Sequence, residues 1–206
     1  MARLSAKLSV VLLAVVMGCD GLPTPAEPAN PEQAAAGAIS AYDTNNNSTL
    51  ETNEIAKSPA LLSAMDKYDA DKDGSLSKQE IQTRVQYYND RLGSLTNFYA
   101  MVTLDGNPLA GAEVKLIPEP WLGSQAKAVT GTTDDKGMVV FRMENADEAG
   151  LYAGVYKLEV TDQGSSVPAR YNTATELGQE VSPDRRELES HVTLALSTAA
   201  PVKKGK

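Results

Sequence analysis

The spacing of apolar residues changes twice along the chain and divides it into three parts. A short, mostly apolar run occupies residues 8–17. Between residues 31 and 93 apolar residues recur with helical spacing, and after about residue 95 they alternate with polar ones. This pattern predicts an α+β multidomain protein, in which a helical part is followed by a small antiparallel β-sandwich.

Three helices are expected in the helical part. Asn30 before Pro31, and Ser58 before Pro59, each place an N-cap residue ahead of a proline at the first helical position. These helices should reach about residues 42 and 68. A third helix should run over residues 77–92 and stop at Gly93. The apolar residues assigned to the core of this part are Leu61, Leu62, Met65, Ile81, Val85 and Tyr88.

Five stretches of alternating residues in the last part predict strands with one buried face. Turn sequences at residues 105–108, 134–137 and 162–164 separate some of them. Asp134 and Asp135 fall in such a turn, so they are not expected to form an acid/base pair. The residues expected to face inward are Phe98, Ala100, Val102, Leu104, Ala112, Val114, Leu116, Val139, Phe141, Met143, Tyr156, Leu158, Val160, Val192, Leu194 and Leu196.

Residues 69–80 contain three alternating aspartates, a glycine at the sixth position and a glutamate at the twelfth. This spacing follows the EF-hand pattern, because a hard cation takes six to eight oxygen ligands and alternating carboxylates can converge on it. Gly74 permits the positive φ of the sharp turn, and Leu76 should point away from the ion. The expected calcium ligands are Asp69, Asp71, Asp73, the Ser75 carbonyl, Ser77 through a water molecule, and Glu80.

Residues 43–54 form a similar but weaker copy of this loop. Ser48 stands where the glycine is expected, and a residue other than glycine enters the left-handed region at a cost of about 1 kcal/mol. The copy also holds fewer carboxylates. Its expected ligands are Asp43, Asn45, Asn47, Thr49, Glu51 and Glu54. The sequence therefore predicts two calcium sites, of which the second binds more tightly.

Two roles for the bound calcium remain open. A sensor opens a methionine-rich groove when calcium rises, but Met65 is the only methionine in residues 31–92. A site that is always filled stabilises the fold by mass action. A structural role is the main hypothesis, and a calcium-responsive regulatory sensor that presents the sandwich to a partner is the alternative.

The beginning of the chain resembles a bacterial lipoprotein signal. Arg3 and Lys7 precede the apolar run, which is too short to span a bilayer. The single cysteine, Cys19, follows the run after Gly18, and residues 16–19 are similar to a lipobox, although Met17 departs from the usual small residue. The resemblance implies lipidation of Cys19 and an extracytoplasmic protein that is lipid-anchored to a bacterial membrane. Prolines 23, 25 and 28 predict an extended tether.

Three motifs of the last part resemble one fold family. They are residues 102–114 (VTLDGNPLAGAEV), 130–137 (TGTTDDKG) and 154–160 (GVYKLEV). Together they are similar to the carboxypeptidase-regulatory-like, prealbumin-like β-sandwich, and the similarity extends over about residues 97–197. The resemblance implies a module for binding, spacing or surface display, with an unidentified cell-surface protein or polysaccharide as its partner.

Composition excludes several functions. The net charge is −8, and removal of the leader leaves 17 basic against 27 acidic residues, so nucleic acid is not an expected partner. One cysteine and one histidine leave no cysteine-cluster or multi-histidine metal site. His191 is expected to be exposed, and no catalytic motif is present, so no enzymatic activity is expected; an uncharacterised hydrolase is a minor alternative. Trp121 could be an exposed stacking platform or could cap the sandwich edge.

The predicted organisation follows from these patterns. The expected segments are a lipoprotein signal peptide (1–18), the lipidated cysteine and proline-rich tether (19–30), the EF-hand pair (31–93), the prealbumin-like β-sandwich (97–198) and a flexible tail (199–206).

Overall fold

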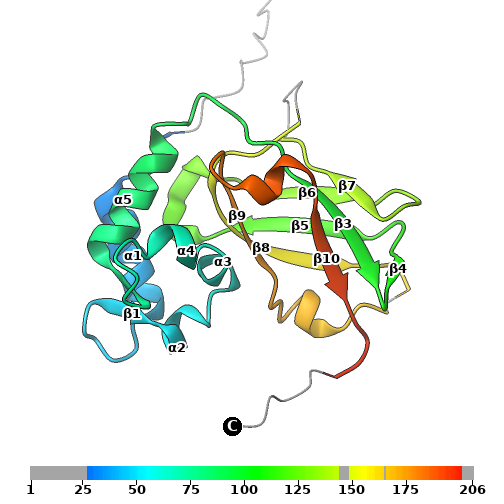
Figure 1. The fold of residues 1–206 in the computed structure, drawn as a ribbon, viewed down its shortest axis with the longest axis horizontal. Coiled ribbons are helices and arrows are strands. Elements are labelled where there is room, and N and C mark those ends of the chain that lie inside the picture. The colour runs from blue at the N-terminus through cyan, green and yellow to red at the C-terminus, as the bar shows by residue number, and fades with distance from the viewer. Residues whose placement is uncertain (1–26, 144–148, 165, 201–206) are drawn as a thin grey trace, which may run out of the picture.

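The computed structural model describes residues 27–143, 149–164 and 166–200, and its elements confirm the α+β class. Helices come first along the chain and lie to one side of the sheets (Figure 1). Cys19, the leader and most of the tether lie outside the described residues. The α-helices are α1 (Pro31–Tyr42), α2 (Thr52–Ile55), α3 (Pro59–Leu62), α4 (Met65–Tyr68) and α5 (Lys78–Asn89).

The two long helices begin within one residue of their predicted starts, at Pro31 and at Lys78. The Asn30 side chain accepts a hydrogen bond from the Gln33 backbone at the start of α1. Ser77 and Glu80 form a reciprocal capping box at the start of α5. Helix α5 ends at Asn89, and turns cover residues 90–93, so the predicted stop at Gly93 falls at the end of these turns. As predicted, it buries Ile81, Val85 and Tyr88.

The segment between the two loops differs from the prediction of one helix over residues 59–68. It is broken into α3 and α4, and the Ser63 hydroxyl donates to the Ala60 carbonyl at the break. Such a bond competes with regular helical hydrogen bonding. Leu61 is buried and Met65 is half-buried, but Leu62 is 49% exposed, so its assignment to the core was wrong.

The strands form two four-stranded sheets and one two-stranded ribbon. One sheet has the order β10-β3-β4, with β7 also paired to β3, and the other has the order β6-β5-β8-β9. The bounds are β1 (Thr49–Glu51), β2 (Ser75–Ser77), β3 (Tyr99–Leu104), β4 (Asn107–Pro108), β5 (Glu113–Pro118), β6 (Val129–Thr132), β7 (Met138–Val140), β8 (Gly154–Thr161), β9 (Gly178–Val181) and β10 (Val192–Leu196). Short 3-10 helices are η1 (Pro120–Gln125), η2 (Ala169–Tyr171) and η3 (Arg186–Glu189).

The expectation of a purely antiparallel arrangement was wrong at one pair of strands. Strand β10 pairs with β3 in parallel, with Leu194 opposite Val102. The chain passes from β9 in the other sheet through residues 182–191, including η3, and enters β10 in the direction of β3. Parallel neighbours need such a long crossover, whereas a hairpin would reverse the chain.

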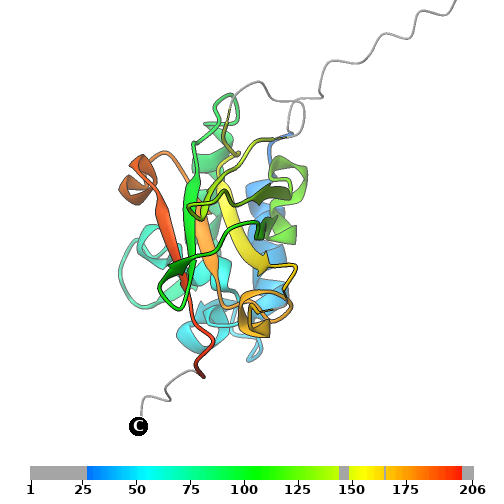
Figure 2. The ribbon, with the colours of Figure 1, turned by 90° about the vertical axis from the view of Figure 1, so that its right-hand side faces the viewer.

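The two larger sheets bury their facing residues in a common core. Figure 2 shows β3 and β10 on one side and β8 on the other. Phe98 and Phe141 stack with their ring centroids 5.2 Å apart. Most of the residues expected to face inward are buried, while Leu104, Met143 and Val192 are half-buried at the margin of the same cluster.

The helical residues belong to the same hydrophobic cluster as the sheets. Helix α3 packs on β9 so closely that a Cβ added to Gly178 would lie 1.9 Å from the Pro59 carbonyl oxygen. In a second contact between the helices and the rest of the chain, Trp121 of η1 packs against Gly37 of α1. Trp121 is therefore a half-buried contact between the two parts rather than an open platform.

Gly37→Ala is expected to destabilise the protein, even though alanine favours helix by about 1 kcal/mol over glycine. Its Cβ would lie 2.9 Å from the Trp121 Cβ, which cannot move without shifting the η1 backbone. We expect a net loss of about 1–2 kcal/mol in the free energy of unfolding. Urea denaturation measures it, and a gain in stability would contradict the packing of Trp121 on α1.

Candidate metal centre

The two predicted loops lie side by side because a short antiparallel ribbon joins them. Residues 43–54 are called the first loop and residues 69–80 the second loop. Strands β1 and β2 pair with Leu50 opposite Leu76, and both leucine side chains are fully buried. Leu76 thus points away from its loop, as expected. The ribbon leaves the polar side of each loop free to face solvent.

The second loop brings its three aspartates together. Carboxylate oxygens of Asp69, Asp71 and Asp73 all lie within 4.8 Å of one another. Backbone N–H groups of Asp73 and Gly74 donate to Asp69 at 3.1 and 3.0 Å. Gly74 has φ +85°, in the region that glycine tolerates best. This loop therefore turns its carboxylates toward one region of space.

Glu80 closes the second loop from its far end. Its carboxylate accepts hydrogen bonds from the backbone of Ala70 at 2.9 Å and of Ser77 at 2.8 Å. Glu80, at the twelfth position of the loop, therefore holds the second position (Ala70) and the ninth (Ser77) by hydrogen bonds to one carboxylate. Ser77 also donates its hydroxyl to the Glu80 carboxylate at 2.8 Å and accepts a hydrogen bond from the Glu80 backbone N–H at 3.2 Å, and this second bond makes the serine a helix cap.

The first loop repeats this hydrogen-bond scheme. Asp43 accepts from the backbones of Asn46 at 2.6 Å and Ser48 at 2.9 Å. Glu54 accepts from the backbones of Thr44 at 2.7 Å and Glu51 at 3.2 Å. The Glu54 contacts and the Ser48 contact match those of Glu80 and Asp69, but Asp43 accepts from the fourth position of its loop where Asp69 accepts from the fifth. The two loops therefore share one local architecture.

The remaining predicted ligands of the first loop contact one another. Asn45 and Asn47 donate their side-chain amides to the Glu51 carboxylate. Thr49 donates its hydroxyl to the side-chain oxygen Oδ1 of Asn47 at 2.8 Å. Amides in place of carboxylates lower the negative charge of this loop, which weakens its attraction for a divalent cation.

The donor set of the second loop fits a hard divalent cation. Within the described residues, Asp69, Asp71 and Asp73 are the only group of three or more acidic, histidine or cysteine side chains close enough to share a metal ion. Hydrogen bonds from Ser75 lower the pKa of Asp73, and those from Thr44 lower the pKa of Glu54 to about 2. Both carboxylates are therefore ionised at neutral pH, as metal ligands must be.

Ser48→Gly is expected to strengthen the first loop. Ser48 has φ +69°, as its position in the pattern predicts, and glycine adopts that conformation without the clash of a Cβ. We expect a gain of about 1 kcal/mol in the free energy of unfolding and tighter calcium binding at this loop. Calorimetry and urea denaturation measure both, and a destabilised variant would contradict the strain assigned to Ser48.

Two buried glutamates, which the sequence analysis did not single out, connect the loops to the sheets. Glu119 precedes η1, is 1% exposed, and accepts hydrogen bonds from the hydroxyls of Tyr42 and Ser58, each at 2.7 Å. Burial and the neighbouring Glu119 carboxylate raise the pKa of Tyr42 to about 12. The phenol therefore stays protonated and keeps donating over the physiological range.

Glu180, in β9, is fully buried between two arginines. It accepts from Arg84 at 2.7 Å, from Arg185 at 2.6 Å and from the Tyr88 hydroxyl at 2.5 Å. Arg84 also forms a fork of hydrogen bonds with Asp184. Burial alone would raise the pKa of Asp184, but the hydrogen bonds from Arg84 and Ser182 hold it well below its usual range.

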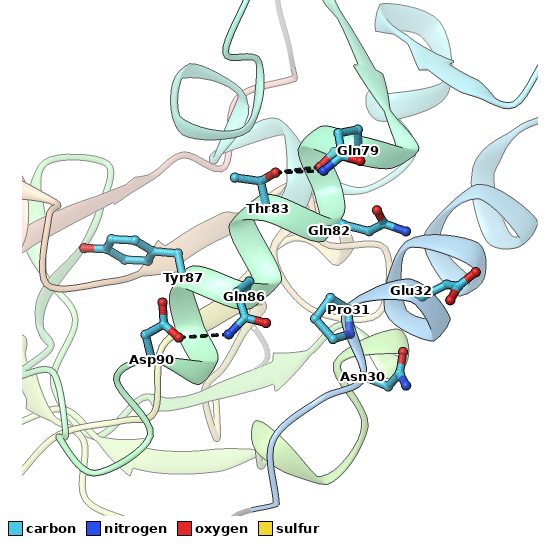
Figure 3. A pocket seen from close by; sticks show the side chains of 9 residues that line it. All are labelled: Asn30, Pro31, Glu32, Gln79, Gln82, Thr83, Gln86, Tyr87 and Asp90. Carbon is cyan, nitrogen blue, oxygen red and sulfur yellow. Dashed lines mark hydrogen bonds between the residues drawn. The ribbon is translucent and has the colours of Figure 1, made fainter.

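An open groove of about 670 Å³ lies between α5 and the start of α1 (Figure 3). Its lining includes Gln79, Gln82 and Gln86 from α5, but Gln79 and Gln86 already donate their amides to Thr83 and Asp90. The Tyr87 ring beside it contacts the guanidinium groups of Arg84 and Arg91. The groove brings together no pairing of a nucleophile with a base, and the sequence analysis did not anticipate it.

The other candidate residues are placed as follows. Asp134 accepts hydrogen bonds from the backbones of Lys136 and Met138, so it belongs to a turn as expected. His191 is exposed, also as expected. No helix among the described residues is long and apolar enough to cross a bilayer.

Comparison of the sequence with family models and with curated proteins found no match in either case.

Proposed function

We propose that this chain is a calcium-binding, lipid-anchored protein of the bacterial cell envelope. In this proposal an EF-hand pair holds calcium at the second loop and, more weakly, at the first. A prealbumin-like β-sandwich serves as an interaction or display module toward a cell-surface protein or polysaccharide. The observation that carries the calcium part is the convergence of Asp69, Asp71 and Asp73, with Glu80 closing the same loop.

A mainly structural role for calcium is supported by how the helices are packed. A sensor must expose an apolar groove on binding, but the apolar residues of the helices share one cluster with the sheets. Arg84 of α5 is 7% exposed and paired with Glu180 and Asp184. Opening the helical pair would break these buried contacts, which is costly.

Calorimetric titration of the protein with calcium tests the proposal. We expect weak binding, as in extracellular sites, with little change in the binding of a dye that reports exposed apolar surface. Micromolar binding with a large increase in dye fluorescence would contradict the structural role and favour the sensor.

Two further experiments test the other parts of the proposal. Pull-down from cell-envelope extracts with and without chelator tests for a partner of the β-sandwich. Mass spectrometry of the mature N-terminus tests for lipidation of Cys19.

Glu80→Gln is expected to abolish binding at the second loop, because the neutral amide removes one charge and one oxygen ligand. Glu54→Gln is the matched change in the first loop and should remove only the weaker site. Calorimetry of both variants assigns the sites. If Glu80→Gln bound calcium as tightly as the parent protein, the assignment of the second loop would be wrong.

A further inference from the structure

Each loop is held at both ends by one buried glutamate from outside the helical part of the chain: Glu119, directly after β5, for the first loop, and Glu180, in β9, for the second. Tyr42 directly precedes the first loop and Ser58 follows it, and both donate to opposite oxygens of Glu119. The glutamate lies 77 residues along the chain from Tyr42 and 61 from Ser58. The ends of the first loop are therefore fixed by a group that belongs to neither the loop nor its helices.

The second loop is held in the same manner. Tyr68 directly precedes it, and the Tyr68 and Tyr88 hydroxyls lie 3.3 Å apart, while Tyr88 donates to Glu180. Arg84, one turn of α5 after Glu80, binds the same oxygen of Glu180. Glu180 thus reaches the incoming segment through a tyrosine pair and the outgoing helix through a guanidinium group. These two arrangements are called the Glu119 clamp and the Glu180 clamp.

We propose that the two clamps act as positioning devices for the calcium loops, so that the sheets set the calcium affinity of each loop separately. This inference rests on the proposed calcium binding. A loop whose ends are already held loses less conformational freedom when it closes on an ion. By linkage, calcium in a loop must strengthen its clamp by the same free energy.

The chemistry of the clamps makes them separable. Tyr42→Phe removes only the hydroxyl that reaches Glu119 and keeps the ring, and Tyr88→Phe does the same toward Glu180. Tyr87→Phe is the matched control on α5, since no hydrogen bond of the Tyr87 hydroxyl is found among the described residues. The two clamps share no residue, so each variant should act on its own loop.

The test uses the full chain in two parents, each with one calcium site. Glu80→Gln retains only the first loop and Glu54→Gln only the second, and calorimetry gives the calcium affinity of each. Tyr42→Phe should weaken binding about tenfold in the Glu80→Gln parent and less than twofold in the Glu54→Gln parent, since a hydrogen bond to a charged group is lost. Tyr88→Phe should show the reverse pattern, and Tyr87→Phe should change neither affinity.

Each outcome of these titrations either supports the clamps or overturns them. The crossed pattern supports the clamps. Equal weakening of both loops by either variant would mean that the tyrosines stabilise the fold without positioning a loop, and unchanged affinities would mean that the hydroxyls do not act on the loops; both overturn the inference while calcium binding stands. Parents that bind no calcium would overturn the proposed function itself, and the inference with it.

Discussion

Gly178→Ala is expected to detach α3 from β9 and to lower stability more than any other exchange of glycine for alanine in the contact between helices and sheets. The new Cβ would lie 1.9 Å from the Pro59 carbonyl oxygen and 2.5 Å from the Ala60 nitrogen. Both are backbone atoms, so no side-chain rotation relieves the overlap. We expect a loss of about 3 kcal/mol, at the upper end of the range for overpacked sites.

Thermal unfolding followed by circular dichroism measures this effect. A loss of about 3 kcal/mol in a domain of this size lowers the melting temperature by roughly 6–12 °C. Gly93→Ala is the matched control, because a Cβ there meets no atom within 4 Å. It should leave stability unchanged or raise it slightly. Equal melting temperatures for the two variants would show that α3 does not rest on β9.

The local parts of this structure could be predicted because their causes are local. Capping by Asn30 and Ser58, the positive φ at Ser48 and Gly74, and the inward direction of Leu76 all depend on residues a few positions away. Alternation likewise identified the buried face of the five strands that were predicted, β3, β5, β7, β8 and β10, whereas β9 was not predicted. These features follow from backbone geometry and side-chain chemistry within one turn or one strand.

The parts that were missed depend on contacts between distant segments. Side chains alternate between the two faces of a strand in the same way in parallel and antiparallel pairs, so the sequence pattern could not predict that β10 pairs with β3 in parallel. Glu119 and Glu180 look like ordinary solvent-facing acids until the helices cover them. One indication was present in α5. Arg84 falls on the same side of the helix as Ile81 and Tyr88, where a charged residue implies a buried partner.

Glu180→Gln is expected to have the largest effect on stability among single side-chain changes that preserve shape. Arg84 and Arg185 are each 7% exposed and both donate to this carboxylate, which is fully buried. The variant keeps the volume but removes the charge that two buried guanidinium groups share. The amide NH₂ of the introduced glutamine would also face a hydrogen-bond donor, because both carboxylate oxygens of Glu180 accept hydrogen bonds in the parent protein. Breaking a buried ion pair by changing one partner costs about 3–5 kcal/mol.

The matched control is a second glutamate that pairs with Arg185. Glu187 contacts Arg185 at 3.3 Å, but its side chain is 49% exposed. Solvent screens that pair, so Glu187→Gln should cost less than about 1 kcal/mol. Urea denaturation of both variants, with and without calcium, measures the difference. If the two variants were equally stable, the buried contact of Glu180 in β9 with Arg84 of α5 would be wrong, and the helices and sheets would have to be held together by apolar packing alone.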